Sequence, residues 1–126
     1  MQNFELKASK DSPEIHFNCE THLLEIKGKM YPEDAGKFYS PIFKWLETYL
    51  DQLDDQACVV NLEIIYFNSS SSKALMNMFD MFDDAAASGK NITVNWKYRE
   101  EDENIMESGE EYKEDVDNLT FNLVQI

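Results

Sequence analysis

The stretch YFNSSSSK at residues 66–73 joins two segments of opposite character and decides how the chain is organised. Residues 57–65 before it are dense in valine, leucine and isoleucine, which predicts a buried strand. Residues 74–87 after it place apolar side chains at helical spacing, which predicts an amphipathic helix. The four serines are therefore expected where a strand ends and a helix begins.

A helix start of this kind suits two different uses of the serines. Its first backbone N–H groups are unpaired and carry a partial positive charge. Serine and asparagine are favoured capping residues at such a position, and the same environment accommodates a bound or covalent phosphate. A cap needs one hydroxyl, whereas this stretch offers four serines and Asn68. The residue types alone leave both uses open.

The rest of the chain predicts a small mixed sheet with about three helices. Strands are expected at 13–18, 23–27, 57–67, 91–98 and 119–124, and helices at 42–53, 74–87 and 100–114. The first helix starts either at Asp34 or at Ser40-Pro41, with proline in its first turn or as a kink. The order β-β-α-β-α-β-α-β, without repeats or linkers, predicts one α/β domain over residues 1–126.

Composition narrows the classes of function. The formal net charge of −14 disfavours binding to nucleic acid or to an anionic membrane, because both need clustered basic residues. Two cysteines are too few for a disulfide framework. Residues 1–10 lack the apolar core of a signal peptide, and no apolar run is long enough to span a bilayer. We therefore expect a cytoplasmic protein.

Sequence motifs for catalysis, metals or cofactors are missing. The four glycines are scattered, so no phosphate-binding loop is formed. His16, Cys19 and His22 have spacings that a metal site could use, but a hairpin would point these side chains apart. No metal site and no cofactor are predicted. An enzyme hypothesis is left with a small acidic hydrolase that uses a carboxylate near the serines.

Motifs along nearly the whole chain resemble the SiaC family of bacterial regulatory phosphoproteins. The matching pieces occur in the family's order and are Tyr31-Pro32-Glu33, Pro41, Trp45-Leu46-Glu47, Tyr49-Leu50, residues 66–71, Lys73-Ala74-Leu75, Gly89-Lys90, Val94-Asn95-Trp96, Glu100 to Asp102, Glu107 and Gly109-Glu110. The resemblance implies a fold similar to STAS domains, the anti-sigma-factor antagonists. It also implies a non-enzymatic partner switch that is controlled by phosphorylation.

In such families a dedicated serine/threonine kinase modifies a hydroxyl at a helix start, and a PP2C-type phosphatase reverses the modification. The unmodified form binds and activates a diguanylate cyclase in the best-known members, which favours biofilm growth. The family's acceptor threonine, directly after the asparagine, corresponds to Ser69, with Ser70 and Ser71 as alternatives. The partner-binding residues are then expected around the acceptor and along the following helix: Asn68, Ser69, Ser70, Lys73, Met76, Asn77 and Asp80. A family member with a partner other than a cyclase is a further alternative.

Overall fold

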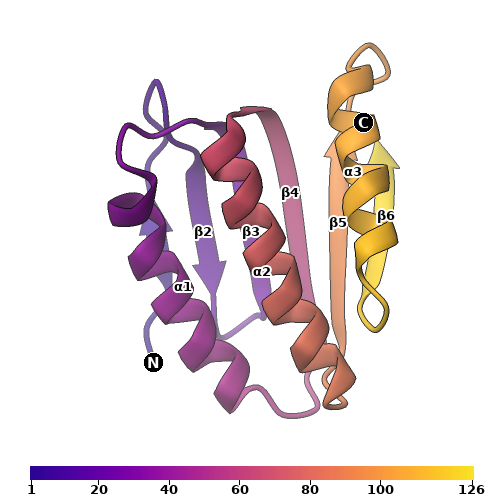
Figure 1. Ribbon diagram of the computed structural model, residues 1–126. Coiled ribbons are helices and arrows are strands. Elements are labelled where there is room, and N and C mark those ends of the chain that lie inside the picture. Colours follow the sequence, from indigo (N-terminus) through magenta and orange to yellow (C-terminus); the bar gives the residue numbers. More distant parts are fainter.

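Six strands form one mixed sheet in the order β1-β2-β3-β4-β5-β6 (Figure 1). The computed structural model describes residues 1–126. The strands are β1 (Phe4–Leu6), β2 (Glu14–Asn18), β3 (Leu23–Met30), β4 (Cys58–Phe67), β5 (Ile92–Tyr98) and β6 (Thr120–Gln125). β1, β2 and β3 pair antiparallel, whereas β3 to β6 run parallel to one another.

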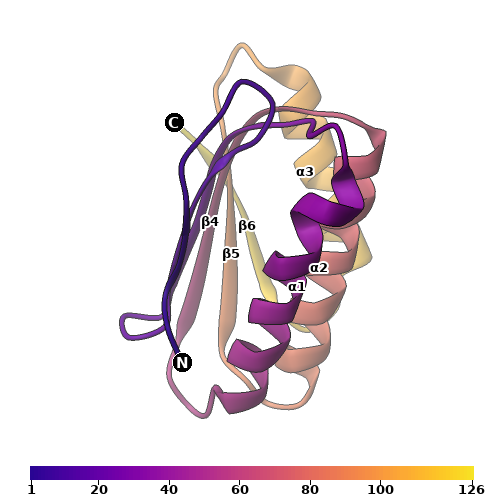
Figure 2. The ribbon, with the colours of Figure 1, turned by 90° about the vertical axis from the view of Figure 1, so that its left-hand side faces the viewer.

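Three helices connect the parallel strands: α1 (Ala35–Gln52), α2 (Ser69–Ala87) and α3 (Glu103–Asp115). Each crossover leads to the next strand in the same direction, and crossovers of this kind are right-handed. All three helices consequently lie on one face of the sheet, and the opposite face is bare (Figure 2). α1 and α2 are therefore neighbours over the centre of the sheet.

The predicted fold class, a mixed α/β sheet with three helices, is confirmed. The structure adds β1, which pairs Phe4 with Phe17 at the edge of the sheet and was not predicted. α1 follows the earlier of its two predicted starts, because Asp34 caps it by accepting a hydrogen bond from the Lys37 amide, and Pro41 lies inside the helix.

Apolar side chains from one face of the sheet and from the helices form a single core. The indole of Trp96 on β5 is fully buried and donates from Nε1 to the carbonyl oxygen of Ile105, over 2.8 Å. Gly109 on α3 lies against this indole, and a Cβ at that position would come within 2.4 Å of Trp96. α3 is therefore fixed to the sheet at close range.

Polar side chains line much of the helix-free face of the sheet, beside the exposed Ile65 of β4. The Asn95 amide on β5 donates to Asn61 Oδ1 on β4, and Asn122 on β6 donates to Asn95 Oδ1, over 2.9 and 3.1 Å. Glu63 on the same face lies within 4 Å of Lys27 and of Arg99, at 3.7 and 3.9 Å. None of the three helices combines the length and the apolar character that crossing a bilayer would require.

Candidate functional site

The serine cluster forms the first turn of α2. Asn68 is the N-cap, and its side-chain oxygen accepts a hydrogen bond of 3.0 Å from the Ser71 amide. The Asn68 carbonyl accepts the first intrahelical bond, from the Ser72 amide, at 2.8 Å. The helix thus begins at Ser69, directly after β4, and earlier than the apolar periodicity from Ala74 had indicated. The capping acceptor is thus the side chain of Asn68 and not a serine hydroxyl.

The four serines of this turn have four different environments. The exposed Ser70 hydroxyl donates to Asn68 Oδ1 over 3.1 Å. The Ser71 hydroxyl is buried and lies 2.6 Å from the Tyr39 hydroxyl on α1. Three of the four hydroxyls have partners within the protein, because Ser72 also lies 2.9 Å from the hydroxyl of Tyr112 on α3.

Ser69 differs from its neighbours because it is exposed and its hydroxyl has no hydrogen-bond partner in the protein. The backbone amides of Ser69 and Ser70 precede the capped Ser71 amide and have no intrahelical acceptor. Lys73 lies four residues later, on the same side of the helix, with its side chain exposed. An added phosphate at Ser69 would therefore meet two free amides and one ammonium group.

The structure argues against Ser71 as an alternative acceptor. Its relative exposure is 0%, and both its hydroxyl and the Tyr39 hydroxyl are inside the α1–α2 contact. A kinase would have to separate the two helices to reach it. Ser70 remains accessible, and its hydroxyl contributes only to the cap.

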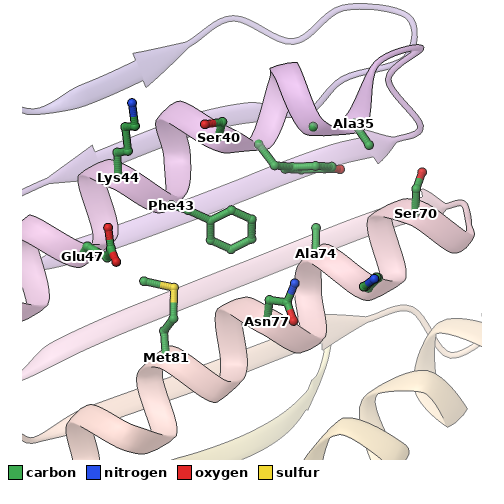
Figure 3. A pocket seen from close by; sticks show the side chains of 12 residues that line it. Ala35, Ser40, Phe43, Lys44, Glu47, Ser70, Ala74, Asn77 and Met81 are labelled. Atoms are coloured by element: carbon green, nitrogen blue, oxygen red, sulfur yellow. The ribbon is translucent and has the colours of Figure 1, made fainter.

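A groove of about 520 Å³ opens between α1 and α2 and begins at this turn (Figure 3). Phe43 of α1 and Met81 of α2 extend into the space between the helices, and Ala74 lies between Phe43 and Ser70, which stands at one end. The full lining comprises Ala35, Gly36, Tyr39, Ser40, Phe43, Lys44, Glu47, Ser70, Lys73, Ala74, Asn77 and Met81. The candidate site is thus a serine-bearing helix start with an open groove beside it.

The predicted partner-binding residues divide between the two flanks of α2. Six of the seven are exposed, and Asn68 is half-buried. Ser70, Lys73 and Asn77 line the groove toward α1. Met76 and Asp80 lie on the other flank, at a small crevice of about 20 Å³ beside α3.

Sequence analysis missed the contribution of α1 to this site. Phe43, Lys44 and Glu47 line the groove but lie more than twenty residues before the serines. The sequence offered only a weak indication of this contribution. Phe43 and Lys44 lie next to the apolar stripe of α1 that packs on the sheet, and this position alone does not predict that they line a groove. Only the parallel placement of α1 and α2 over neighbouring strands brings the two sets together.

Burial keeps the two phenols beside the serines neutral. Desolvation raises the pKa of Tyr39, and the hydrogen bond with Ser71 opposes this only in part. The pKa of Tyr112 is likewise raised by desolvation, against a smaller opposing effect of Ser72. Both phenols therefore act at neutral pH as uncharged hydrogen-bonding partners that position the first turn of α2.

The hydrolase hypothesis requires a base within hydrogen-bond reach of Ser69. Both histidines are engaged elsewhere: His16 contacts Glu14 at 2.5 Å, and His22 Nδ1 lies 2.7 Å from the Tyr49 hydroxyl. The hydrogen bond with Glu14 raises the pKa of His16. Since the Ser69 hydroxyl has no partner, the serine–base pair of this hypothesis is not assembled.

The metal spacing noted in the sequence is not realised as a cluster. Cys19 contacts Asn3 rather than either histidine, with Sγ 3.2 Å from Asn3 Oδ1. The other cysteine, Cys58, is buried beside Tyr49, and burial raises the pKa of its thiol to about 11. A thiol with so high a pKa is a poor nucleophile at neutral pH.

An exposed, unpartnered serine at a helix start, beside an open groove, fits the class of regulatory phosphoproteins, because a helix start accommodates a covalent phosphate. Comparison with protein families agrees with this class: residues 6–126 match the SiaC family regulatory phosphoprotein model. The chain belongs to the SiaC family.

Relatives and solved structures support the assignment. PA14_02130 of Pseudomonas aeruginosa strain UCBPP-PA14 is 26% identical over 115 residues, covering 91% of this chain and 90% of the relative. The crystal structure of apo-SiaC from Pseudomonas aeruginosa superposes with a TM-score of 0.89 at 25% identity, covering 98% and 99% of the two chains. The complex of the diguanylate cyclase SiaD with its activator SiaC, also from Pseudomonas aeruginosa, contains the same fold, with a TM-score of 0.92 at 24% identity over 98% and 99% of the chains.

Proposed function

We propose that this chain is a non-enzymatic partner switch whose state is set by phosphorylation of Ser69. The observation that carries the proposal is the difference in environment among the four serines. Ser70, Ser71 and Ser72 have hydrogen-bond partners within the protein, and Ser69 alone has an exposed hydroxyl without a partner. The family to which the chain belongs is described as regulatory phosphoproteins. A serine/threonine kinase writes the phosphate and a PP2C-type phosphatase removes it.

The output partner in this proposal is a diguanylate cyclase, which the unmodified chain binds and activates. The support is the similar SiaC of Pseudomonas aeruginosa, which is named as the activator of SiaD in their complex. The docking surface comprises the exposed side of α2 and the groove toward α1. Ser69 lies at the edge of this surface, so its modification changes what a docked partner meets.

The physical effect of the phosphate is local. It adds roughly −1.5 to −2 charges and three acceptor oxygens. The helix start tolerates this charge, because the amides of Ser69 and Ser70 have no intrahelical acceptor and the helix dipole is positive at this end. A partner docked over the same place loses a desolvated contact, which costs about 2–5 kcal/mol. That corresponds to roughly thirtyfold or more in affinity, without unfolding of the switch.

The proposal is tested by incubating the purified chain with ATP and its cognate kinase, and by mapping the phosphate with fragment-ion mass spectrometry. We expect Ser69→Ala to abolish the modification and Ser70→Ala to leave it in place. Modification that persists unchanged in Ser69→Ala overturns the assignment.

The second test concerns the output. Ser69→Asp is expected to weaken binding to the cognate cyclase, meaning the cyclase of the same genome that binds the unmodified chain. Its far-ultraviolet circular dichroism is expected to match that of the wild type, since the negative charge sits at a favourable helix end. Equal affinity of Ser69→Asp and the wild type would contradict the switch.

A further inference from the structure

β6 lies at the edge of the sheet and leaves half of its backbone groups without a partner (Figure 1). The Ile126 amide donates to the carbonyl oxygen of Tyr98 on β5, over 2.8 Å. Every second residue before it faces β5 in the same way, because bonded and free residues alternate along a parallel ladder. The amides and carbonyls of Phe121, Leu123 and Gln125 therefore point away from the sheet.

This edge lacks the features by which proteins usually prevent strand pairing. Charged side chains, prolines, bulges and very short strands protect sheet edges. β1 at the opposite edge is three residues long and carries Glu5. β6 has six residues, pairs with β5 without a bulge, and belongs to residues 118–126, which contain no charged side chain. β6 is therefore a regular, open edge that can accept another strand.

The flank of α3 above this edge offers an apolar contact and one charge of each sign. The buried residues of α3 face the sheet, and Asp115 lies at the crevice beside α2. Helical spacing then places Met106, Glu110 and Lys113 on the opposite flank, over the free edge of β6. Met106 is half-buried there, and Lys113 is the only basic residue of α3. Neither Glu110 nor Lys113 takes part in an ion pair of the chain.

We propose that β6 pairs antiparallel with β6 of a second copy of this chain, about a two-fold axis at Leu123. In this register Leu123 faces Leu123 of the second copy, and Phe121 faces Gln125 in both directions. Each of the three facing pairs exchanges two backbone hydrogen bonds, which satisfies the groups that the monomer leaves free. This inference is independent of the phosphorylation of Ser69.

The same axis brings the two α3 helices together. Gly109 of α3 lies over Leu123, since a Cβ on it would come within 2.8 Å of Leu123 Cδ2. The axis therefore passes beside the middle of α3, and the antiparallel arrangement sets Met106 opposite Lys113 of the second copy. The ammonium of that lysine can then pair with Glu110, and the same pair forms in the other direction. A flank that complements itself favours a second copy over a segment of uniform charge.

The contact has the size of a transient interface. Six residues of β6 span about 20 Å, and the edge of the sheet with the helix above it is roughly 20 Å deep. The pair therefore buries about 800 Å² in total, less than the roughly 1,200 Å² at which stable complexes begin. The net charge of −14 also opposes association. We accordingly expect a dimer at high micromolar concentration.

Edge pairing leaves the serine turn free. All helices lie on one face of the sheet (Figure 2). Because the two-fold axis crosses the sheet, the helices of both copies lie on the same side of one continuous sheet. In each copy α3 lies between α2 and the axis, so Ser69 stays exposed (Figure 1). The dimer therefore presents two copies of the switch on one face.

Amide hydrogen exchange of the native chain, followed by nuclear magnetic resonance, identifies the paired edge. The Val124 amide is bonded to β5 in the monomer, whereas the Leu123 and Gln125 amides become bonded only in the dimer. Exchange of these two should slow at least about threefold between about 10 and 500 μM protein, while Val124 is protected throughout. Rates at Leu123 and Gln125 that do not change with concentration overturn the proposal.

Charge reversal tests the contact between the α3 helices by sedimentation velocity. Lys113→Glu leaves glutamate at both positions, and Glu110→Lys leaves lysine at both. Each variant alone should dimerise about tenfold more weakly than the wild type, because like charges meet twice across the axis. Their equimolar mixture should dimerise like the wild type, since it restores both pairs. Lys37→Glu on α1 is the matched control and should dimerise normally, because Lys37 is exposed on another helix. A mixture no stronger than the single variants overturns the proposal.

A proline on the free edge tests the strand pairing itself. Gln125→Pro removes an amide that points away from the sheet, at a kind of position where proline is tolerated. We expect Gln125→Pro to be monomeric at about 500 μM and the control Gln125→Ala to dimerise like the wild type. A dimer that persists in Gln125→Pro uses another surface and refutes this one. The charge-reversed pair decides the matter if Gln125→Pro does not fold.

Discussion

The hydroxyl pair of Tyr39 and Ser71 allows a quantitative test of the structural role assigned to Ser71, which is to hold α2 against α1 through a buried hydrogen bond. The two oxygens lie 2.6 Å apart, and the residues are 2% and 0% exposed. Ser71→Ala leaves the Tyr39 hydroxyl buried without a partner, and Tyr39→Phe leaves the Ser71 hydroxyl in the same situation. An unsatisfied buried hydroxyl costs about 1–3 kcal/mol, so each single substitution should lower the free energy of unfolding by that amount.

The double substitution should cost less than the sum of the two. With both hydroxyls gone, no polar group is left unpaired, and the remaining phenyl and methyl groups keep most of the packing. We expect a coupling free energy of at least about 1 kcal/mol in a double-mutant cycle. For a domain of this size each kcal/mol corresponds to about 3–6 °C in Tm.

Urea denaturation followed by circular dichroism measures the four free energies of the cycle. Ser70→Ala is the matched control: its hydroxyl is exposed and the substitution should change stability by less than about 0.5 kcal/mol. The kinase should still modify Ser69 in Ser71→Ala, because the buried hydroxyl has no part in the modification. Strictly additive substitutions, or loss of the modification in folded Ser71→Ala, would refute the reasoning.

Three further predictions concern the elements around the site. Gly109→Ala should destabilise the fold by about 1–3 kcal/mol in thermal unfolding, because its Cβ would overlap the indole of Trp96. Asn68→Ala should cost about 1 kcal/mol in urea titrations, since it removes the cap of α2. Desolvation raises the pKa of Asp83, but backbone hydrogen bonds from residues 117–119 outweigh it and hold the pKa below its usual value. Asp83→Asn should therefore destabilise most at neutral pH, and the difference from wild type should disappear as the pH falls below about 4.

Local patterns of apolar and polar residues in the sequence were sufficient to predict most of the strands and helices. The strand–helix junction at residues 66–73 was predictable because an apolar run ends there and a helical period follows. The strict alternation of residues 91–98 likewise placed β5. β1 was missed because three residues are too short to show any period, and its existence depends on pairing with Phe17 and its neighbours on β2.

The site was only half predictable for a different reason. The start of α2 and the exposure of its polar stripe follow from nearby residues, so Ser69, Lys73 and Asn77 were found where expected. The partners that distinguish the serines are Tyr39 and Tyr112, which lie 32 and 40 residues away in sequence. No spacing rule connects such pairs, and only the stacking of helices on one face of the sheet brings them into contact.

A run of four identical residues presents a kinase with four chemically identical hydroxyls. The fold removes that equivalence, because it commits one hydroxyl to the cap and one to each neighbouring helix. In the proposed switch, the fold of the substrate therefore narrows the choice of acceptor to the exposed hydroxyls of Ser69 and Ser70. A kinase acting on this turn still has to distinguish Ser69 from the exposed Ser70, the other hydroxyl that it can reach.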